Sequence, residues 1–339
     1  VTFLKPIDEI NPEAVSEYVV DYSERNNRDN QNPIFNFTNG RVSEFSPGKT
    51  SIQIKNNELE NSIIATLNEL LESENNELSI NVPHTSKDPD FTLENINNYG
   101  IKELIGVGTS KYAGSIASRV HNISVASRKF NGVLVAPGDT FSFNKTLGEV
   151  SSSTGYQQAY VIKDGATVLG DGGGVCQVST TLFRAVMNAG LPIAERRAHS
   201  YRVGYYEQDS PPGLDATVYE PSPDFKFTND TGHHILIQTM ANSSASSLRF
   251  EIYGTKDGRV SSISKPVVSS VTPTPEDLYI DDDTLPTGAI KQIAWKAWGA
   301  KVYVNYKVTR KGDAIFEKPF YSTCQPWQAK FLRGTGSGV

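Results

Sequence analysis

A glycine-rich turn runs into an apolar helical pattern in the stretch Gly170-Asp-Gly-Gly-Gly-Val-Cys-Gln-Val-Ser-Thr-Thr-Leu-Phe-Arg-Ala-Val186. Its three consecutive glycines allow positive φ angles and a close approach of the backbone to a ligand. Apolar residues then recur at helical spacing as far as Gly190, which can end a helix. The sequence therefore predicts a turn that delivers Cys176 onto the first turn of a helix.

Cys176 is a candidate nucleophile. A thiol at a helix N-terminus lies beside unpaired N–H groups and the positive end of the helix dipole, which both favour the thiolate. The N–H groups around Gly173 and Gly174 could hold an oxyanion. The residues alone leave an alternative open, in which the glycines form a tight turn and Cys176 is a small buried hydrophobic residue.

His199 is the candidate base, because it follows the cysteine helix after one short connection and a cysteine nucleophile needs a partner for its proton. Asp215 could orient the ring, although Asp209 and Asp224 lie equally near in sequence. A purely structural histidine is the alternative. We predict that the oxyanion-holding and substrate-binding residues are Gly173, Gly174, Gln177, Ser179, Arg196 and Ser200.

Little in the sequence supports binding of a metal, a phosphate group, a cofactor or nucleic acid. Scattered histidines and one cysteine provide no ligand pair at zinc spacing, and no Gly-Lys-Ser/Thr follows the glycines, so neither a metal, a phosphate loop nor a cofactor is predicted. The 339 residues carry 32 basic and 38 acidic side chains, a net charge of −6, without a basic cluster that would favour nucleic acid.

Composition favours a location outside the cytoplasm. Methionine and cysteine are scarce, at two each, while Asn, Ser and Thr are abundant. Two cysteines are too few for a disulfide scaffold, although Cys176 and Cys324 could pair in an exported protein. No run of eighteen apolar residues could span a membrane. The chain begins at Val1, and we expect any membrane contact to come only from an anchor upstream of it.

The predicted fold class is α+β and multi-domain. A central mixed α/β domain of catalytic type, residues 101–256, is flanked by a small α+β module at 1–100 and a small, mostly β module at 276–339. Residues 257–275 are rich in Ser, Pro and Thr and are predicted to be a linker.

Shorter patterns place the elements. In the first module, Asn39-Gly40 predicts a hairpin turn between two strands, Ile34–Thr38 and Arg41–Phe45. A helix from Asn57 and a strand at Glu77–Val82 follow.

In the central domain we predict a helix near Ser115, with Ile116 facing inward and Arg119 and Asn122 facing outward. Strands are predicted at Ile101–Val107, on both sides of Pro137-Gly138, and at Tyr160–Ile162, Ala166–Leu169, Phe225–Phe227, Ile235–Ile237 and Leu248–Tyr253.

Taken together, the motifs of residues 100–254 resemble the VanW domain, a family named after vancomycin-resistance clusters. The resemblance rests on Asn131-Gly132, Ala136–Asn144, Gly172–Leu182, Glu195-Arg196, His199-Ser200, Asp215–Val218 and Asp224–Phe227. Residues 1–100 are similar to the peptidoglycan-binding module that often precedes this domain. The C-terminal part, with Gly288, Gly299, Gly312 and Arg333-Gly-Thr-Gly336, resembles the small β module named after its five glycines.

The resemblance implies a protein of the bacterial cell envelope that acts on peptidoglycan stem peptides. Some VanW-domain proteins are reported to be L,D-transpeptidases that use a cysteine nucleophile and lack the YkuD-type domain. Cys176 and His199 match the family's motif cysteine and histidine. On this basis, Cys176 would acylate on a stem peptide, His199 would deprotonate the acceptor amine, and Arg196 could bind a stem carboxylate.

Two alternatives belong to other functional classes. In the first, the protein binds the cell wall without catalysis and Cys176 is buried and unreactive. In the second, a cysteine endopeptidase or amidase uses the same residues with water in place of the amine. The sequence does not identify the diamino acid of the stem peptide or the oligomeric state.

Overall fold

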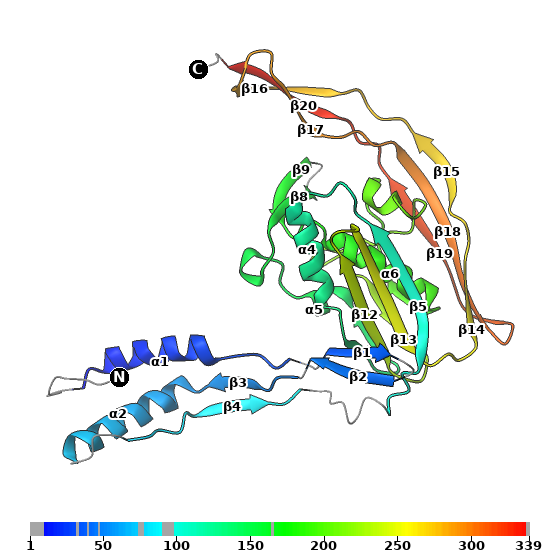
Figure 1. The fold of residues 1–339 in the computed structure, drawn as a ribbon. Coiled ribbons are helices and arrows are strands. Elements are labelled where there is room, and N and C mark those ends of the chain that lie inside the picture. Colours follow the sequence, from blue (N-terminus) through cyan, green and yellow to red (C-terminus); the bar gives the residue numbers. More distant parts are fainter. Residues whose placement is uncertain are drawn as a thin grey trace. The chain divides into compact units, whose positions relative to one another are not determined.

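The computed structural model describes residues 10–31, 34–38, 41–46, 48–73, 78–89, 98–163 and 166–336. The chain divides into two compact units, one made of Val1–Phe35 and Ser43–Ile96 and the other of Asn36–Val42 and Asn97–Val339. Helices and several antiparallel sheets occur in the chain (Figure 1), so the predicted α+β class is confirmed. No helix in the described ranges is both long and apolar enough to cross a membrane.

The first unit contains helices α1 (Pro12–Asn26) and α2 (Asn56–Glu72) and the antiparallel pair β3 (Ser51–Ile54) and β4 (His84–Lys87). Helix α1 begins after Asn11, whose side-chain oxygen accepts from the Glu13 N–H at 2.9 Å. Three buried apolar residues, Val15, Val19 and Leu59, form its small core.

The predicted helix from Asn57 is confirmed as α2, and the two strands around Asn39-Gly40 are confirmed as β1 (Ile34–Thr38) and β2 (Arg41–Ser46). The strand predicted at Glu77–Val82 is wrong, because residues 78–83 form no strand and the pairing with β3 begins at His84. A short alternating pattern indicates a strand but not where its partner lies.

In the second unit, one sheet has the order β5-β13-β12-β6. Its strands are all antiparallel neighbours and comprise β5 (Glu103–Lys111), β6 (Val133–Val135), β12 (Ile235–Asn242) and β13 (Ser247–Gly254). Helix α6 (Val175–Asn188) packs on this sheet (Figure 1). Gly108 on β5 makes this approach possible, because a Cβ there would lie 2.2 Å from the Thr181 carbonyl oxygen.

Helix α4 (Ala117–Arg128) packs beside α6. A second sheet has the order β10-β11-β7, formed by β10 (Ile193–Glu195), β11 (Lys226–Thr228) and β7 (Thr140–Ser142). The hairpin of β8 (Gln158–Lys163) and β9 (Ala166–Asp171) leads directly into the glycine turn. Short helices complete the domain: α5 (Phe143–Leu147), η1 (Ser152–Thr154) and η2 (Gly204–Glu207).

The segment 257–275, predicted to be a linker, instead forms β14 (Arg259–Ile263) and β15 (Val267–Thr272). Both strands pair with β18 (Gly299–Arg310), and β18 also pairs with β19 (Asp313–Cys324). The prediction is wrong because the exposed faces of these strands carry Ser and Thr, so their composition imitates that of a linker. A further sheet has the order β16-β20-β17, with β16 (Leu278–Pro286), β17 (Ile290–Ala294) and β20 (Lys330–Gly336).

The sheet around β18 shares a hydrophobic core with the central domain. Tyr306, Val308 and Phe320 belong to the same buried cluster as the apolar face of α6. The Tyr306 hydroxyl donates to the Leu191 carbonyl at 3.0 Å. Residues 101–256 and the β18 sheet therefore pack as parts of one unit.

Candidate active site

The glycine turn before α6 is held by its own conformation and by close packing. Gly172 and Gly174 have φ of +80° and +116°, values at which a side chain causes strain. A Cβ at Gly173 would lie 2.8 Å from the Tyr160 carbonyl oxygen, and one at Gly174 would lie 3.2 Å from the Arg119 carbonyl oxygen. Protein atoms therefore fill the space on the Cβ side of these glycines, and the oxyanion-holding role of the Gly173 and Gly174 N–H groups remains a prediction.

Two polar side chains of α4 stabilise the turn and the start of α6 by hydrogen bonds. Asn122 donates to the carbonyls of Gly173 at 3.1 Å and Gln157 at 2.7 Å. Arg119 donates to the side chain of Gln177 at 3.0 Å. Both residues are buried, contrary to the prediction that they face outward, while Ile116 is 43% exposed. The helical periodicity is misleading here because hydrogen bonds to the turn compensate for burying polar groups.

Cys176 is the second residue of α6 and is partly exposed. Its Sγ lies 3.7 Å from the Thr217 hydroxyl and 3.5 Å from the Val218 carbonyl oxygen. The neighbouring N–H groups of Val175 and Gln177 donate within the turn, at 2.9 Å each. The Cys176 N–H, by contrast, has no acceptor within the described part of the chain.

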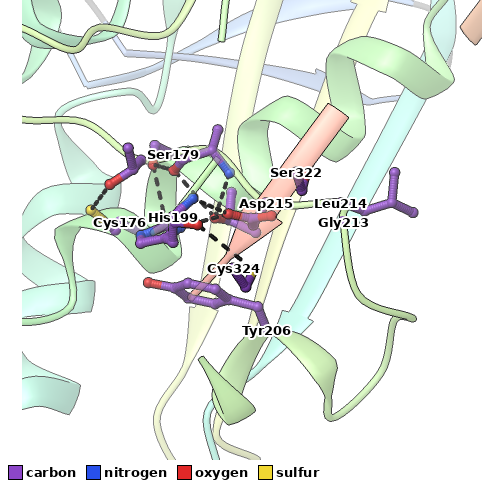
Figure 2. A network of polar contacts seen from close by, with 12 residues as sticks. Cys176, Ser179, His199, Tyr206, Gly213, Leu214, Asp215, Ser322 and Cys324 are labelled. Atoms are coloured by element: carbon purple, nitrogen blue, oxygen red, sulfur yellow. Dashed lines mark hydrogen bonds and ion pairs between the residues drawn. The ribbon is translucent and has the colours of Figure 1, made fainter. Parts of the chain in front are cut away.

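His199 is held by a single carboxylate. Its Nδ1 lies 2.7 Å from Asp215 Oδ2, and its backbone N–H donates to the same oxygen at 2.8 Å. A carboxylate only accepts, so Nδ1 carries the proton and Nε2 is the ring nitrogen left for Cys176. The His199 ring and the Cys176 side chain lie next to each other at the start of α6 and interact electrostatically (Figure 2).

The other two aspartates that were candidates to orient His199 lie elsewhere. Asp209 accepts from Arg184 at 3.1 Å. Asp224 accepts from the Ser142 hydroxyl at 2.6 Å and from the Asn144 N–H at 2.9 Å, at the start of α5. The structure therefore brings Cys176, His199 and Asp215 together and keeps Asp209 and Asp224 apart from them.

The three groups shift one another's pKa values. Burial raises the pKa of the Cys176 thiol, but the hydrogen bond and charge of His199 outweigh it, so this pKa lies below its ordinary value. Burial alone would lower the pKa of His199, yet the contacts with Asp215 and Cys176 raise it to about 9. Burial likewise opposes ionisation of Asp215, whose pKa is nevertheless lowered to about 2, chiefly by His199. These shifts move all three groups toward their charged forms.

Arg196 lies behind Asp215 and does not face the solvent, since its side chain is only 1% exposed. Its Nη2 donates to Asp215 Oδ1 at 3.1 Å, and its Nε donates to the Asp215 carbonyl at 2.6 Å. The guanidinium is therefore buried against protein acceptors. The predicted role in binding a stem carboxylate is wrong for this reason.

Gln177 and Ser179 are also wrong as substrate-binding residues, because both are fully buried. Gln177 accepts from Arg119, and the Ser179 hydroxyl donates to the Ala216 carbonyl at 2.6 Å. Ser200 is exposed, and its carbonyl accepts from the Gln325 N–H at 2.6 Å. A substrate contact by the Ser200 side chain remains a prediction.

Sequence analysis missed three residues at the site. Thr217 and Val218 touch the Cys176 sulfur, and the Tyr206 ring lies 4.9 Å from the His199 ring between centroids. Thr217 could have been found from the sequence. Residues two positions apart in an extended segment share a face, and Thr217 lies two positions after Asp215. No comparable signal marks Tyr206.

Cys324 of β19 also lies at this site. Its thiol is 3.8 Å from the His199 carbonyl oxygen, and both it and Cys176 are free thiols. Burial raises the pKa of Cys324 to about 11, so the two thiols differ strongly in ionisation. Cys324, Asp215 and Tyr206 help to line a small, partly open cavity of about 20 Å³, room for about one water molecule. Nowhere in the described ranges do three or more His, Cys, Asp or Glu cluster as metal ligands would.

Comparison with known proteins agrees with the VanW resemblance. Residues 118–253 match the family model described as VanW like protein. Cys176, His199 and Asp215 all fall within the segment that is similar to this family.

Two curated relatives match parts of the chain. The protein YoaR of Bacillus subtilis is 40% identical over 159 residues, which are 47% of this chain and 51% of YoaR. The vancomycin B-type resistance protein VanW of Enterococcus faecalis is 33% identical over 115 residues, 34% of this chain and 42% of that protein. The chain thus spans about half the length of these relatives or less.

Two solved G5 domains are also similar to parts of this chain. The G5 domain of an IgA1 protease shares 14% identity over 24% of this chain and 95% of that one, with a TM-score of 0.16. A second G5 domain shares 18% identity over 22% of this chain and 97% of that one, with a TM-score of 0.13.

Proposed function

We propose that this chain is a cysteine acyltransferase of the bacterial cell envelope, an L,D-transpeptidase that cross-links peptidoglycan stem peptides. The hydrogen bond between His199 Nδ1 and Asp215, with the Cys176 thiol next to the same ring, supports this proposal most directly. A nucleophile, a base in contact with it, and a third group that orients the base are the parts that nucleophilic acyl transfer needs.

The first half of the reaction acylates Cys176. The thiolate attacks the amide carbonyl carbon between the third and fourth residues of a donor stem peptide. The new C–S bond forms while the C–N bond breaks. The His199 imidazolium gives its Nε2 proton to the departing nitrogen, and D-alanine leaves.

The second half transfers the acyl group. An amine from a neighbouring stem peptide attacks the thioester carbonyl, and neutral His199 takes its proton. A C–N bond forms, the C–S bond breaks, and the thiolate and imidazolium return to their starting state. Asp215 keeps the same His199 tautomer in both halves, because it accepts from Nδ1 throughout.

The Cys176 N–H is the oxyanion donor of this proposal. It lies on the first turn of α6, where the helix dipole favours negative charge. Removing one such donor in other enzymes costs about 10² to 10³ in rate. The neighbouring N–H groups of Val175 and Gln177 are occupied within the turn, so they contribute to its shape instead.

Thiolate reactivity decides between catalysis and simple wall binding. The interaction with His199 lowers the pKa of Cys176, whereas burial raises the pKa of Cys324. This contrast favours catalysis. The extracytoplasmic location and the stem-peptide partners belong to the same proposal, because the VanW resemblance implies them.

The test is intact-mass spectrometry after incubation with a carbapenem or a stem tetrapeptide. We expect one adduct on the wild type, none on Cys176→Ala, and an unchanged adduct on Thr323→Ala, which alters an exposed residue of β19. A folded wild type that forms no adduct and resists iodoacetamide would mean that the protein only binds the wall. Muropeptide analysis then separates cross-linking, which joins stems, from hydrolysis, which shortens them.

A further inference from the structure

The end of strand β19 lies against the segment that carries the histidine and carboxylate of the candidate site (Figure 2). The Ser322 hydroxyl accepts from Arg196 Nη2 at 3.0 Å, and the Tyr321 carbonyl accepts from Arg196 Nη1 at 3.2 Å. Just beyond, the Gln325 N–H donates to the Ser200 carbonyl at 2.6 Å. Residues more than a hundred positions downstream therefore touch both sides of this segment.

These contacts are in the protein interior. Ser322 is 2% exposed, and the side chain of Arg196 is 1% exposed. A hydrogen bond to a buried charge is stronger than one between neutral groups, and losing it is costly because water cannot replace the partner freely. Removing the Ser322 hydroxyl should therefore have a large effect on how the buried Arg196 side chain is held.

We propose that Ser322, near the end of β19, is a positioning residue that acts through Arg196 to hold Asp215 where it orients His199. The proposal rests on the proposed function, because it concerns the base of that reaction. The site is then incomplete without the C-terminal sheet.

The geometry of the guanidinium gives the physical reason. Its donors lie in one rigid plane, so fixing two of them fixes the third. The β19 acceptors fix Nη1 and Nη2, and Nη2 in turn holds Asp215 Oδ1 at 3.1 Å. The other carboxylate oxygen then faces both donors of His199. Nη2 also donates to the Gly213 carbonyl at 3.0 Å. Without the Ser322 hydroxyl, the two hydrogens of Nη2 are shared between Gly213 and Asp215 alone, so the Asp215 carboxylate shifts and the His199 ring follows it.

Several titratable groups face Asp215 and His199, so pH profiles are compared between variants of one background. These groups are Cys176 and Arg184 on α6, Arg196 after β10, Tyr206 on η2 and Cys324 on β19. Substituting Ser322 adds no titratable group to this set. Any change in the profile therefore reports a change in how the existing groups are arranged.

The experiment measures the pH dependence of Cys176 alkylation by iodoacetamide in the full chain, read by peptide mass mapping. We expect Ser322→Ala to lower the alkylation rate at neutral pH about tenfold and to raise the midpoint by about one pH unit. Ser322→Thr keeps the hydroxyl and should restore the wild-type midpoint. Thr323→Ala is the matched control on the same strand, exposed where Ser322 is buried, and should match the wild type.

Ser322→Val fills the site without an acceptor and favours a strand, so its midpoint tests the idea even if Ser322→Ala does not fold. In the transpeptidation assay, the kcat of Ser322→Ala should fall while its KM stays constant, because Ser322 touches no substrate. A low wild-type midpoint that neither Ser322→Ala nor Ser322→Val moves would overturn this inference alone. A wild-type midpoint near that of a free thiol would instead overturn the proposed function.

Discussion

Asp215 Oδ2 accepts two hydrogen bonds from one residue, the backbone N–H and the ring Nδ1 of His199, at 2.8 and 2.7 Å. The carboxylate therefore fixes both the position of the residue in the chain and the orientation of its ring. Asp215 Oδ2 thus contacts both the main chain of His199 and the ring nitrogen whose proton sets the tautomer.

Asp215→Asn should lower the rate of Cys176 acylation by about 10² to 10⁴. An amide can donate toward Nδ1, which would favour the wrong tautomer of His199 and place a proton on the nitrogen facing Cys176. The rate of adduct formation with a carbapenem, measured by mass spectrometry, tests this. Thermal unfolding of the same variant serves as a control, because Asp215 also neutralises buried Arg196. A rate within threefold of the wild type would show that Asp215 has no orienting role.

The thiolate and imidazolium state should give a characteristic pH profile. Alkylation of Cys176 should reach its plateau below the ordinary range of a free thiol, since the His199 contact lowers the Cys176 pKa. Acylation by a stem peptide also needs the His199 proton, so its rate should fall above pH about 9. Measuring the alkylation and acylation rates from pH 5 to 10 on one preparation tests both the rise of alkylation and the fall of acylation. An alkylation midpoint near 8.5 would contradict the ion pair.

Acid should destabilise the protein through Asp215. Its folded pKa is about 2, below the unfolded value of about 3.9, so the stabilisation is present above pH about 4 and is lost as pH falls toward 2. Denaturant titrations across this range should show the free energy of unfolding declining less steeply in Asp215→Asn. Equal slopes for both proteins would mean that other carboxylates account for the acid sensitivity.

Gly174→Ala should destabilise the protein more than Gly155→Ala. Both glycines have positive φ, +116° and +92°, so either substitution costs about 1–2 kcal/mol in backbone strain. A Cβ at Gly155 meets open space, whereas one at Gly174 would lie 2.9 Å from Ile123 Cγ1. Chemical denaturation should therefore give a larger loss for Gly174→Ala. Similar losses would show that the turn can open away from α4.

Tyr306→Phe should lower the free energy of unfolding by about 1–3 kcal/mol, because it leaves the Leu191 carbonyl without the hydroxyl donor. Tyr303→Phe, on the same strand but only partly buried, is the control and should have little effect. Since both segments share one core, the loss should appear in the main unfolding transition. A separate early transition for the C-terminal sheet would argue against the shared core.

The sequence alone identified the local chemistry of the site. The glycine turn and the helical spacing after it placed Cys176 at a helix start, and the order of motifs singled out His199. These conclusions depend on residues close together in the chain, where periodicity and backbone preferences act directly. The central strands and the helix at α2 were predictable for the same reason.

Only the tertiary structure determines which polar side chains contact His199 and the residues that hold it. Asp209, Asp215 and Asp224 are equivalent in sequence, and a three-dimensional contact selects Asp215. Arg196 turned inward, and Ser322 came to it from a strand that pairs far along the chain. Composition could not reveal this, because whether a polar side chain is buried depends on the partners that folding brings to it. The position of the base is thus a property of the whole second unit.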